Sequence, residues 1–233
     1  MDHEIRLIVF DWDGTLIDSR DLIVACMQAA IREVDLPPRT DAQVADIIGL
    51  GLREAVETLY PEVSAERRAA MIDRYRRHWL ARQHECRLFP GARETLERLH
   101  QAGFLLAVAT GKSRAGLERS LQETGLARLF SSTRCADETA SKPDPRMLHE
   151  ILGELDVPAS AAILVGDTEY DLEMARRAGV AALGVCYGVH EATRLSRHRP
   201  LAILDRITRL PDWLAEYRAR GRRAVTVTQG MSG

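Results

Sequence analysis

The chain has 233 residues, which is enough for one large core and a smaller inserted unit. Its hydrophobic fraction of 45% and charged fraction of 28% are ordinary for a globular protein. The net charge of −2 creates no overall field that would attract nucleic acid or an anionic membrane. We therefore expect no nucleic-acid partner and no membrane partner.

The cysteines and the N-terminus suggest a cellular compartment. No two cysteines form a C-x-x-C pair, and none has a histidine at the spacing of a zinc site. Met1 leads into a predicted strand without the basic and apolar regions of a signal peptide. No apolar run approaches the length that a bilayer requires. We expect a cytoplasmic protein with four buried or half-buried thiols in a reducing environment, at Cys26, Cys86, Cys135 and Cys186.

Five short apolar runs predict strands that are buried on both faces, as in a parallel sheet. Stretches with helical periodicity separate them, and Ser113, Gly125 and Gly179 are predicted to cap helices. Strands that alternate with helices indicate an α/β fold with a Rossmann-like parallel sheet. The predicted strands are 5–10, 104–109, 162–165, 181–185 and 201–204, and the predicted helices are 92–102, 114–123, 144–154 and 168–178.

The region from 19 to 85 interrupts this alternation. It contains no convincing strand, and its periodicity predicts helices over 21–34, 41–48, 52–60 and 65–84. We therefore predict a helical cap domain at 19–85, inserted into a core domain formed by 1–18 and 86–215. Residues 216–233 are expected to form a flexible tail.

The first strand ends in Asp11-Trp12-Asp13-Gly14-Thr15. Ligands of open α/β sheets bind beyond the carboxyl ends of the strands, so chemistry is expected in this loop. Asp11 and Asp13 share one face of an extended segment, and two such carboxylates need a cation or a proton between them. An Asp-Gly turn is common, however, and this motif alone favours an ordinary turn.

Three further polar motifs follow predicted strands. Thr110-Gly111-Lys112-Ser113 offers a hydroxyl and free amides at a helix start, where a phosphate could bind. Lys142 lies in a proline-rich loop, and Gly166-Asp167 is followed one helical turn later by Asp171. Each motif has an ordinary explanation as a capped turn, a surface lysine or an acidic first turn of a helix. Four of them in this order at strand ends indicate one site.

The four motifs together resemble those of the haloacid dehalogenase superfamily, in its phosphoglycolate phosphatase-like branch with a helical cap. The resemblance implies a magnesium-dependent phosphatase that acts on small phosphate monoesters, such as phosphoglycolate or a sugar phosphate, through an aspartyl-phosphate. It implies that Asp11 is the nucleophile and that Asp13 is the general acid and base. Thr110 and Lys142 would bind the transferring phosphoryl group.

The resemblance also implies the remaining site residues. Magnesium would be held by Asp11, the backbone of Asp13 and Asp167, with Asp171 as a further ligand or as an orienting residue. The substrate-binding residues would be Thr15, Gly111 and Lys112, together with Arg53 from the cap loop, which could bind an anionic part of the substrate. The alternative for Arg53 is an exposed arginine at a helix start.

Asp13 favours phosphate esters, because dehalogenase relatives lack this second aspartate. Two alternatives stay open: a phosphosugar mutase of the β-phosphoglucomutase type, and a catalytically silent phosphate-binding relative. A small-molecule phosphate ester is the expected partner, and the chain could be a monomer or a homodimer. We expect no catalytic role for the remaining histidines and tryptophans considered, which are His78, His84, His190, His198, Trp79 and Trp213.

Overall fold

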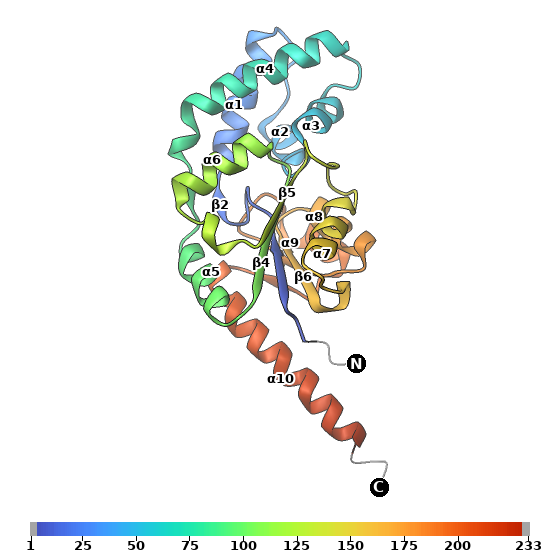
Figure 1. The fold of residues 1–233 in the computed structure, drawn as a ribbon. Coiled ribbons are helices and arrows are strands. Elements are labelled where there is room, and N and C mark those ends of the chain that lie inside the picture. The colour runs from blue at the N-terminus through green and yellow to red at the C-terminus, as the bar shows by residue number, and fades with distance from the viewer. Residues whose placement is uncertain (1–3, 230–233) are drawn as a thin grey trace.

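The structure is a computed structural model and describes residues 4–229. Figure 1 shows a sheet with helices on both sides and a group of helices at one end of it. The six strands are all parallel, in the order β5-β4-β1-β6-β7-β8. They are β1 (Leu7–Phe10), β4 (Leu105–Thr110), β5 (Ser132–Cys135), β6 (Ala162–Gly166), β7 (Ala181–Val185) and β8 (Ala202–Leu204).

The predicted α/β class with a parallel sheet is confirmed. All five strands predicted from apolar runs are present within one or two residues of their expected bounds. Strand β5 was not predicted, because Ser-Thr-Arg-Cys lies at the edge of the sheet and has no apolar run.

Both faces of the sheet are covered, and this explains the continuous apolar run of β1. Ile8 and Phe10 face one core, while Leu7 and Val9 face the other, and all four are fully buried. Burial of each such side chain contributes about 1.5–3 kcal/mol. Helices α5 (Ala92–Gln101), α6 (Arg114–Thr124) and α10 (Leu210–Gln229) cover the first face, and α7 (Arg146–Glu154), α8 (Glu169–Ala178) and α9 (Ala192–Leu195) cover the second.

The cap is a separate layer with a core of its own. It contains α1 (Arg20–Glu33), α2 (Asp41–Asp46), α3 (Leu52–Leu59) and α4 (Ala65–Arg82), which pack around residues such as Met27, Val56 and Met71. Two short strands, β2 (Ile17–Asp18) and β3 (Arg87–Leu88), pair antiparallel where the chain enters and leaves the cap. The domain boundaries expected at 18/19 and 85/86 stay predictions, and they fall next to this pair of strands.

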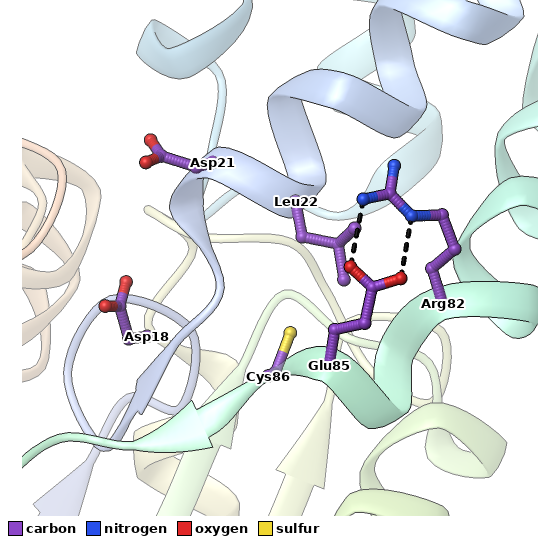
Figure 2. A pocket seen from close by; sticks show the side chains of 6 residues that line it. All are labelled: Asp18, Asp21, Leu22, Arg82, Glu85 and Cys86. Atoms are coloured by element: carbon purple, nitrogen blue, oxygen red, sulfur yellow. Dashed lines mark hydrogen bonds and ion pairs between the residues drawn. The ribbon is translucent and has the colours of Figure 1, made fainter.

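A hollow lies beside these two strands, and Figure 2 shows its lining. Arg82 pairs with Glu85 through two hydrogen bonds of 2.9 Å. Asp18 is the last residue of β2, and Cys86 directly precedes β3. None of the predicted catalytic residues lines this hollow.

Three further expectations concern the ends and the thiols. Residues 216–229, expected to be a flexible tail, continue α10 in the described backbone, and residues 230–233 of that tail lie outside the described residues. Cys26 and Cys135 are buried and Cys86 is half-buried, but Cys186 is exposed, because it follows the last residue of β7. No helix in the described range 4–229 combines the length and apolar character needed to cross a bilayer.

Candidate active site

The register of the sheet brings the predicted acidic residues to one edge. Phe10 of β1 pairs with Val108 of β4 and with Val165 of β6. Asp11 therefore leaves the sheet between the ends of its two neighbours, which continue into Thr110 and Asp167. Strand β1 lies between β4 and β6, so the chain order of the motifs becomes a spatial cluster.

Three carboxylates meet at this edge. One oxygen of each of Asp11, Asp167 and Asp171 lies within 4.8 Å of the others, and all three side chains are buried. Asp11 and Asp167, which are far apart in the sequence, thus converge as expected. Three buried carboxylates this close repel one another unless cations balance their charge.

Lys142 supplies one of these cations. Its Nζ lies 2.7 Å from Asp11 Oδ1 and 2.6 Å from Asp171 Oδ1, and its side chain is fully buried. Burial alone would lower the pKa of this ammonium, but the two carboxylates outweigh burial and raise its pKa above the ordinary value. Lys142 therefore stays charged, and the alternative of a solvated surface lysine is wrong.

A single lysine does not balance the cluster, as the pKa values of the acids show. Burial, opposed by Lys142 and assisted by Asp171 and Asp167, raises the pKa of Asp11 well above its ordinary value. Burial and the nearby Asp171 raise the pKa of Asp167 to about 7. Such shifts identify a place where a further positive charge would be favourable.

The donor set fits a hard divalent cation. It consists of carboxylate oxygens, the ligands that magnesium prefers. Neither buried carboxylate oxygen of Asp11 has an aligned hydrogen-bond donor within the described residues, and its contact with Lys142 is a close ion pair. Asp11 and Asp167 can therefore offer oxygens to a metal at this edge of the sheet.

Asp171 is engaged differently from the other two acids. Its Oδ2 accepts hydrogen bonds from the backbone N–H of Thr168 at 3.1 Å and from the Thr168 hydroxyl at 2.6 Å. These bonds form a capping box at the start of α8. Its Oδ1 contacts Lys142, as Asp11 Oδ1 also does, so these contacts are compatible both with direct metal binding and with an orienting role.

The side chain of Asp13 lies outside the three-carboxylate cluster. Its Oδ1 accepts from the Ser19 hydroxyl at 2.7 Å and from the Lys112 ammonium at 3.0 Å, and its Oδ2 accepts from Lys112 at 2.9 Å. The carboxylate of Asp13 therefore faces Ser19 and Lys112 and lies apart from the three clustered carboxylates.

The loop after β7 supports Asp167 and was not predicted from the sequence. The backbone N–H of Val189 donates to Asp167 Oδ2, and the Thr15 hydroxyl donates to Oδ1, both at 2.8 Å. A Cβ at Gly188 would lie 2.4 Å from Asp167 Oδ2, and a Cβ at Gly14 would lie 2.2 Å from it. Both glycines are needed because the backbone passes directly against this carboxylate.

The other predicted substrate-binding residues do not share one environment. Thr110 is fully buried at the end of β4. Gly111 packs against the cap loop, because a Cβ there would lie 2.5 Å from the carbonyl oxygen of Leu50. Arg53 is exposed at the start of α3, and no hydrogen bond or ion pair of its side chain is found within residues 4–229.

Two histidines have partners that the sequence did not indicate. His78 Nε2 lies 2.8 Å from Glu33 Oε1 in the cap. His190 is buried, its Nδ1 accepts from the backbone N–H of Glu169 at 3.0 Å, and its backbone N–H donates to the carbonyl of Asp167 at 3.2 Å. His190 thus supports the loop around Asp167, although no motif includes it.

Comparison with known proteins agrees with this geometry. The family model of haloacid dehalogenase-like hydrolases matches residues 8–185, which include all four motifs. The chain belongs to this family. Two similar curated relatives are a phosphoglycolate phosphatase of Vibrio vulnificus, 35% identical over 90% of this chain and 96% of the relative, and the "probable phosphatase IndB" of Dickeya dadantii, 36% identical over 85% and 89%.

Solved structures of this family have the same fold. A crystal structure described as a predicted phosphoglycolate phosphatase from Haemophilus somnus superposes with a TM-score of 0.79, at 26% identity, over 89% of this chain and 97% of that one. A haloacid dehalogenase-like hydrolase from Bacteroides fragilis has a TM-score of 0.83 at 24% identity, over 89% and 100%, and shows the fold alone. The family and these relatives identify the chain as a phosphatase of the phosphoglycolate phosphatase-like type.

Proposed function

We propose that the chain hydrolyses small-molecule phosphate monoesters in a magnesium-dependent reaction that passes through an aspartyl-phosphate on Asp11. The observation that carries this proposal is the position of Asp11. It is a buried carboxylate at the end of the central strand, 2.7 Å from Lys142 and within 4.8 Å of two further acids. The ion pair with Lys142 positions this carboxylate, and neither of its oxygens has an aligned hydrogen-bond donor within residues 4–229, so an oxygen is available to attack phosphorus.

In the first step, an oxygen of Asp11 attacks phosphorus and the ester oxygen leaves with the electron pair of the broken P–O bond. Lys142 and the hydroxyl of Thr110 would contact the transferring phosphoryl group, where negative charge is concentrated. Their complete burial supports this role, because electrostatic interactions are stronger where water is excluded.

Asp13 would complete both steps as the acid and base. It would protonate the departing alkoxide, and then take a proton from the water that cleaves the phosphoryl-aspartate. Asp13 is two residues from the nucleophile and is almost buried, and Ser19 and Lys112 hold its carboxylate in a defined position.

Asp11, Asp167 and the backbone carbonyl of Asp13 would hold the magnesium ion. When bound, the ion would neutralise negative charge on the cluster and on the phosphoryl oxygens. The raised pKa values of Asp11 and Asp167 support this assignment, because both acids are shifted in the direction that a cation would reverse.

The substrate would be a small phosphate ester such as phosphoglycolate or a sugar phosphate. Several curated relatives are named phosphoglycolate phosphatases, which supports the first of these. Arg53 follows the Gly49–Gly51 loop of the cap, which contacts the core at Gly111, and its guanidinium has no partner among residues 4–229. A bidentate contact with a carboxylate would suit this group.

The test is the release of inorganic phosphate from a panel of metabolite phosphates and para-nitrophenyl phosphate, with magnesium and with a chelator. We expect magnesium-dependent release that is abolished in Asp11→Asn. Undiminished release by Asp11→Asn would contradict the proposal, as would failure of the wild type on the whole panel. Activity only with a bisphosphate primer would instead indicate a phosphosugar mutase.

A further inference from the structure

Lys112 connects the acid–base carboxylate to the cap. It follows β4 in the Thr110-Gly111-Lys112 motif, and its Nζ donates to both oxygens of Asp13, at 3.0 and 2.9 Å. The side chains of Lys112 and Asp13 are only 8% and 12% exposed. The pair is therefore shielded from solvent, unlike the surface ion pairs that contribute little.

The same ammonium also contacts the cap. Lys112 Nζ lies 4.4 Å from the centroid of the Trp79 ring, which belongs to α4. This is the distance of a cation–π contact, and tryptophan gives the strongest such contact of the aromatic side chains. Trp79 is itself stacked on Tyr75, one helical turn earlier, with 6.3 Å between ring centroids and 16° between planes. The ring that faces Lys112 is thus fixed within the cap.

The second donor to Asp13, Ser19, lies at the start of the cap, whereas Lys112 itself belongs to the core. Ser19 precedes α1, and its hydroxyl donates to Asp13 Oδ1 at 2.7 Å. The carboxylate that would act as acid and base is therefore held by two groups, and both depend on where the cap lies. Within the described residues, no other side-chain donor contacts Asp13.

We infer that Lys112 is a positioning residue for Asp13, and that Trp79 positions Lys112 in turn. This inference rests on the proposed function. It assigns Lys112 to the acid–base carboxylate, whereas the sequence motif alone assigned it to the substrate. The acid–base group is aligned only when α4 lies over the core, so protonation of the leaving group depends on the position of the cap.

This arrangement predicts a dependence on the leaving group. A poor leaving group, such as the alkoxide of an alkyl phosphate, needs a proton from Asp13 as it departs, whereas para-nitrophenolate leaves without one. Loss of alignment at Asp13 should therefore slow alkyl phosphates more than para-nitrophenyl phosphate. A general structural defect would slow both equally.

The experiment measures kcat/KM for para-nitrophenyl phosphate, glycerol phosphate and phosphoglycolate in Lys112→Met, which keeps the length of the side chain and removes its charge. We expect kcat/KM for both alkyl phosphates to fall about tenfold more than for para-nitrophenyl phosphate, since small misplacements of a catalytic group have effects of about this size or larger. Lys112→Arg, which keeps the charge and can pair with a carboxylate through two bonds, should recover part of the loss. Arg114→Ala is the matched control, because Arg114 lies two residues away and pairs with Glu138 on the surface of the core.

The role of the cap is tested at Trp79. In Trp79→Leu, kcat/KM for the alkyl phosphates should fall about threefold more than kcat/KM for para-nitrophenyl phosphate. Trp79→Phe, which keeps an aromatic ring, should be close to wild type. Because Trp79 acts through Lys112, the double variant Lys112→Met/Trp79→Leu should lose no more activity on alkyl phosphates, relative to para-nitrophenyl phosphate, than Lys112→Met alone. Additive effects of the two substitutions would overturn the assignment of Trp79.

The other outcomes separate the alternatives. Equal losses on all three substrates would overturn the positioning role of Lys112 and leave the proposed function intact. A loss confined to phosphoglycolate would show that Lys112 binds the substrate carboxylate, and this too would overturn the inference. Failure of the proposed function would appear separately, as undiminished activity of Asp11→Asn.

Discussion

At the scale of single residues, the main feature of the site is an excess of buried acidic side chains over basic ones. Asp11, Asp13, Asp167 and Asp171 are buried within one region, and two ammonium groups, those of Lys142 and Lys112, contact them. The four acids therefore exceed the two bases within this group, which explains why a divalent cation would be favourable there. The substrate phosphate would bring further negative charge to the same place.

Asp13 is the residue whose loss should be most informative. Asp13→Asn keeps the shape of the side chain but removes the acid and base, so turnover of an alkyl phosphate should fall by roughly two to four orders of magnitude. Steady-state rates with glycerol phosphate measure this. Near-normal turnover of that poor leaving group would remove Asp13 from the acid–base role.

Arg53 tests substrate recognition. If its guanidinium binds a carboxylate of the substrate, Arg53→Ala should raise KM for phosphoglycolate about tenfold, the loss expected for a charge-assisted pair. KM for para-nitrophenyl phosphate, which has no carboxylate, should change little. Equal changes in both KM values would mean that Arg53 is a bystander on the surface of the cap.

Individual elements show which parts of the site a sequence can reveal. Strands β1, β4 and β6 carry apolar runs that end in Asp11, Thr110 and the Gly166-Asp167 pair, so local patterns gave both the strands and the residues after them. The loop after β7 has no such pattern. Its contribution comes from the backbone N–H of Val189 and from the closeness of Gly188 to Asp167, and these depend on tertiary contacts.

The contacts of the cap were unpredictable for the same reason. The helices of the cap followed from their periodicity, but the cation–π contact of Trp79 with Lys112 joins α4 to the loop after β4. The bond from the backbone N–H of Gly51 to the Ser141 hydroxyl, at 2.7 Å, also joins the cap to the core. Such pairs leave no mark on local composition, so no catalytic role was expected for Trp79.

Gly188, in the loop after β7, gives a prediction about the support of Asp167. In Gly188→Ala, the added Cβ would lie 2.3 Å from the carbonyl oxygen of Gly14 and 2.4 Å from Asp167 Oδ2, so Asp167 must move. We expect the magnesium concentration for half-maximal activity to rise about tenfold, as for other losses of support to a metal ligand. Gly153→Ala is the control, because nothing lies within 4 Å of its Cβ, and an unchanged requirement in both variants would contradict the prediction.

The stability of the whole molecule should depend on pH through the acidic cluster. Burial raises the pKa of Asp167 to about 7, so without metal the folded state holds a proton that the unfolded state has lost above pH 4. This group therefore makes the metal-free protein less stable as pH rises from about 4 to 7. Magnesium binds the ionised acids, so its stabilising effect should be larger at pH 8 than at pH 5.5.

Thermal melts at these two pH values, with magnesium and with a chelator, measure this effect. Asp167→Asn removes the titrating group, so its melting temperature in chelator should fall less than that of the wild type as pH rises. Other acids titrate in both proteins, and the comparison between them cancels those contributions. A wild type stabilised equally by magnesium at both pH values would be inconsistent with a metal held by Asp167.

The most direct test of the account is the site of phosphorylation. Asp13→Asn should slow cleavage of the phosphoryl-aspartate more than its formation from para-nitrophenyl phosphate, so the intermediate should accumulate. We would quench this reaction with acid and locate the added phosphoryl group by mass spectrometry of peptides. The account predicts the group on Asp11 and none in the double variant Asp11→Asn/Asp13→Asn; a phosphoryl group on any other residue would contradict it.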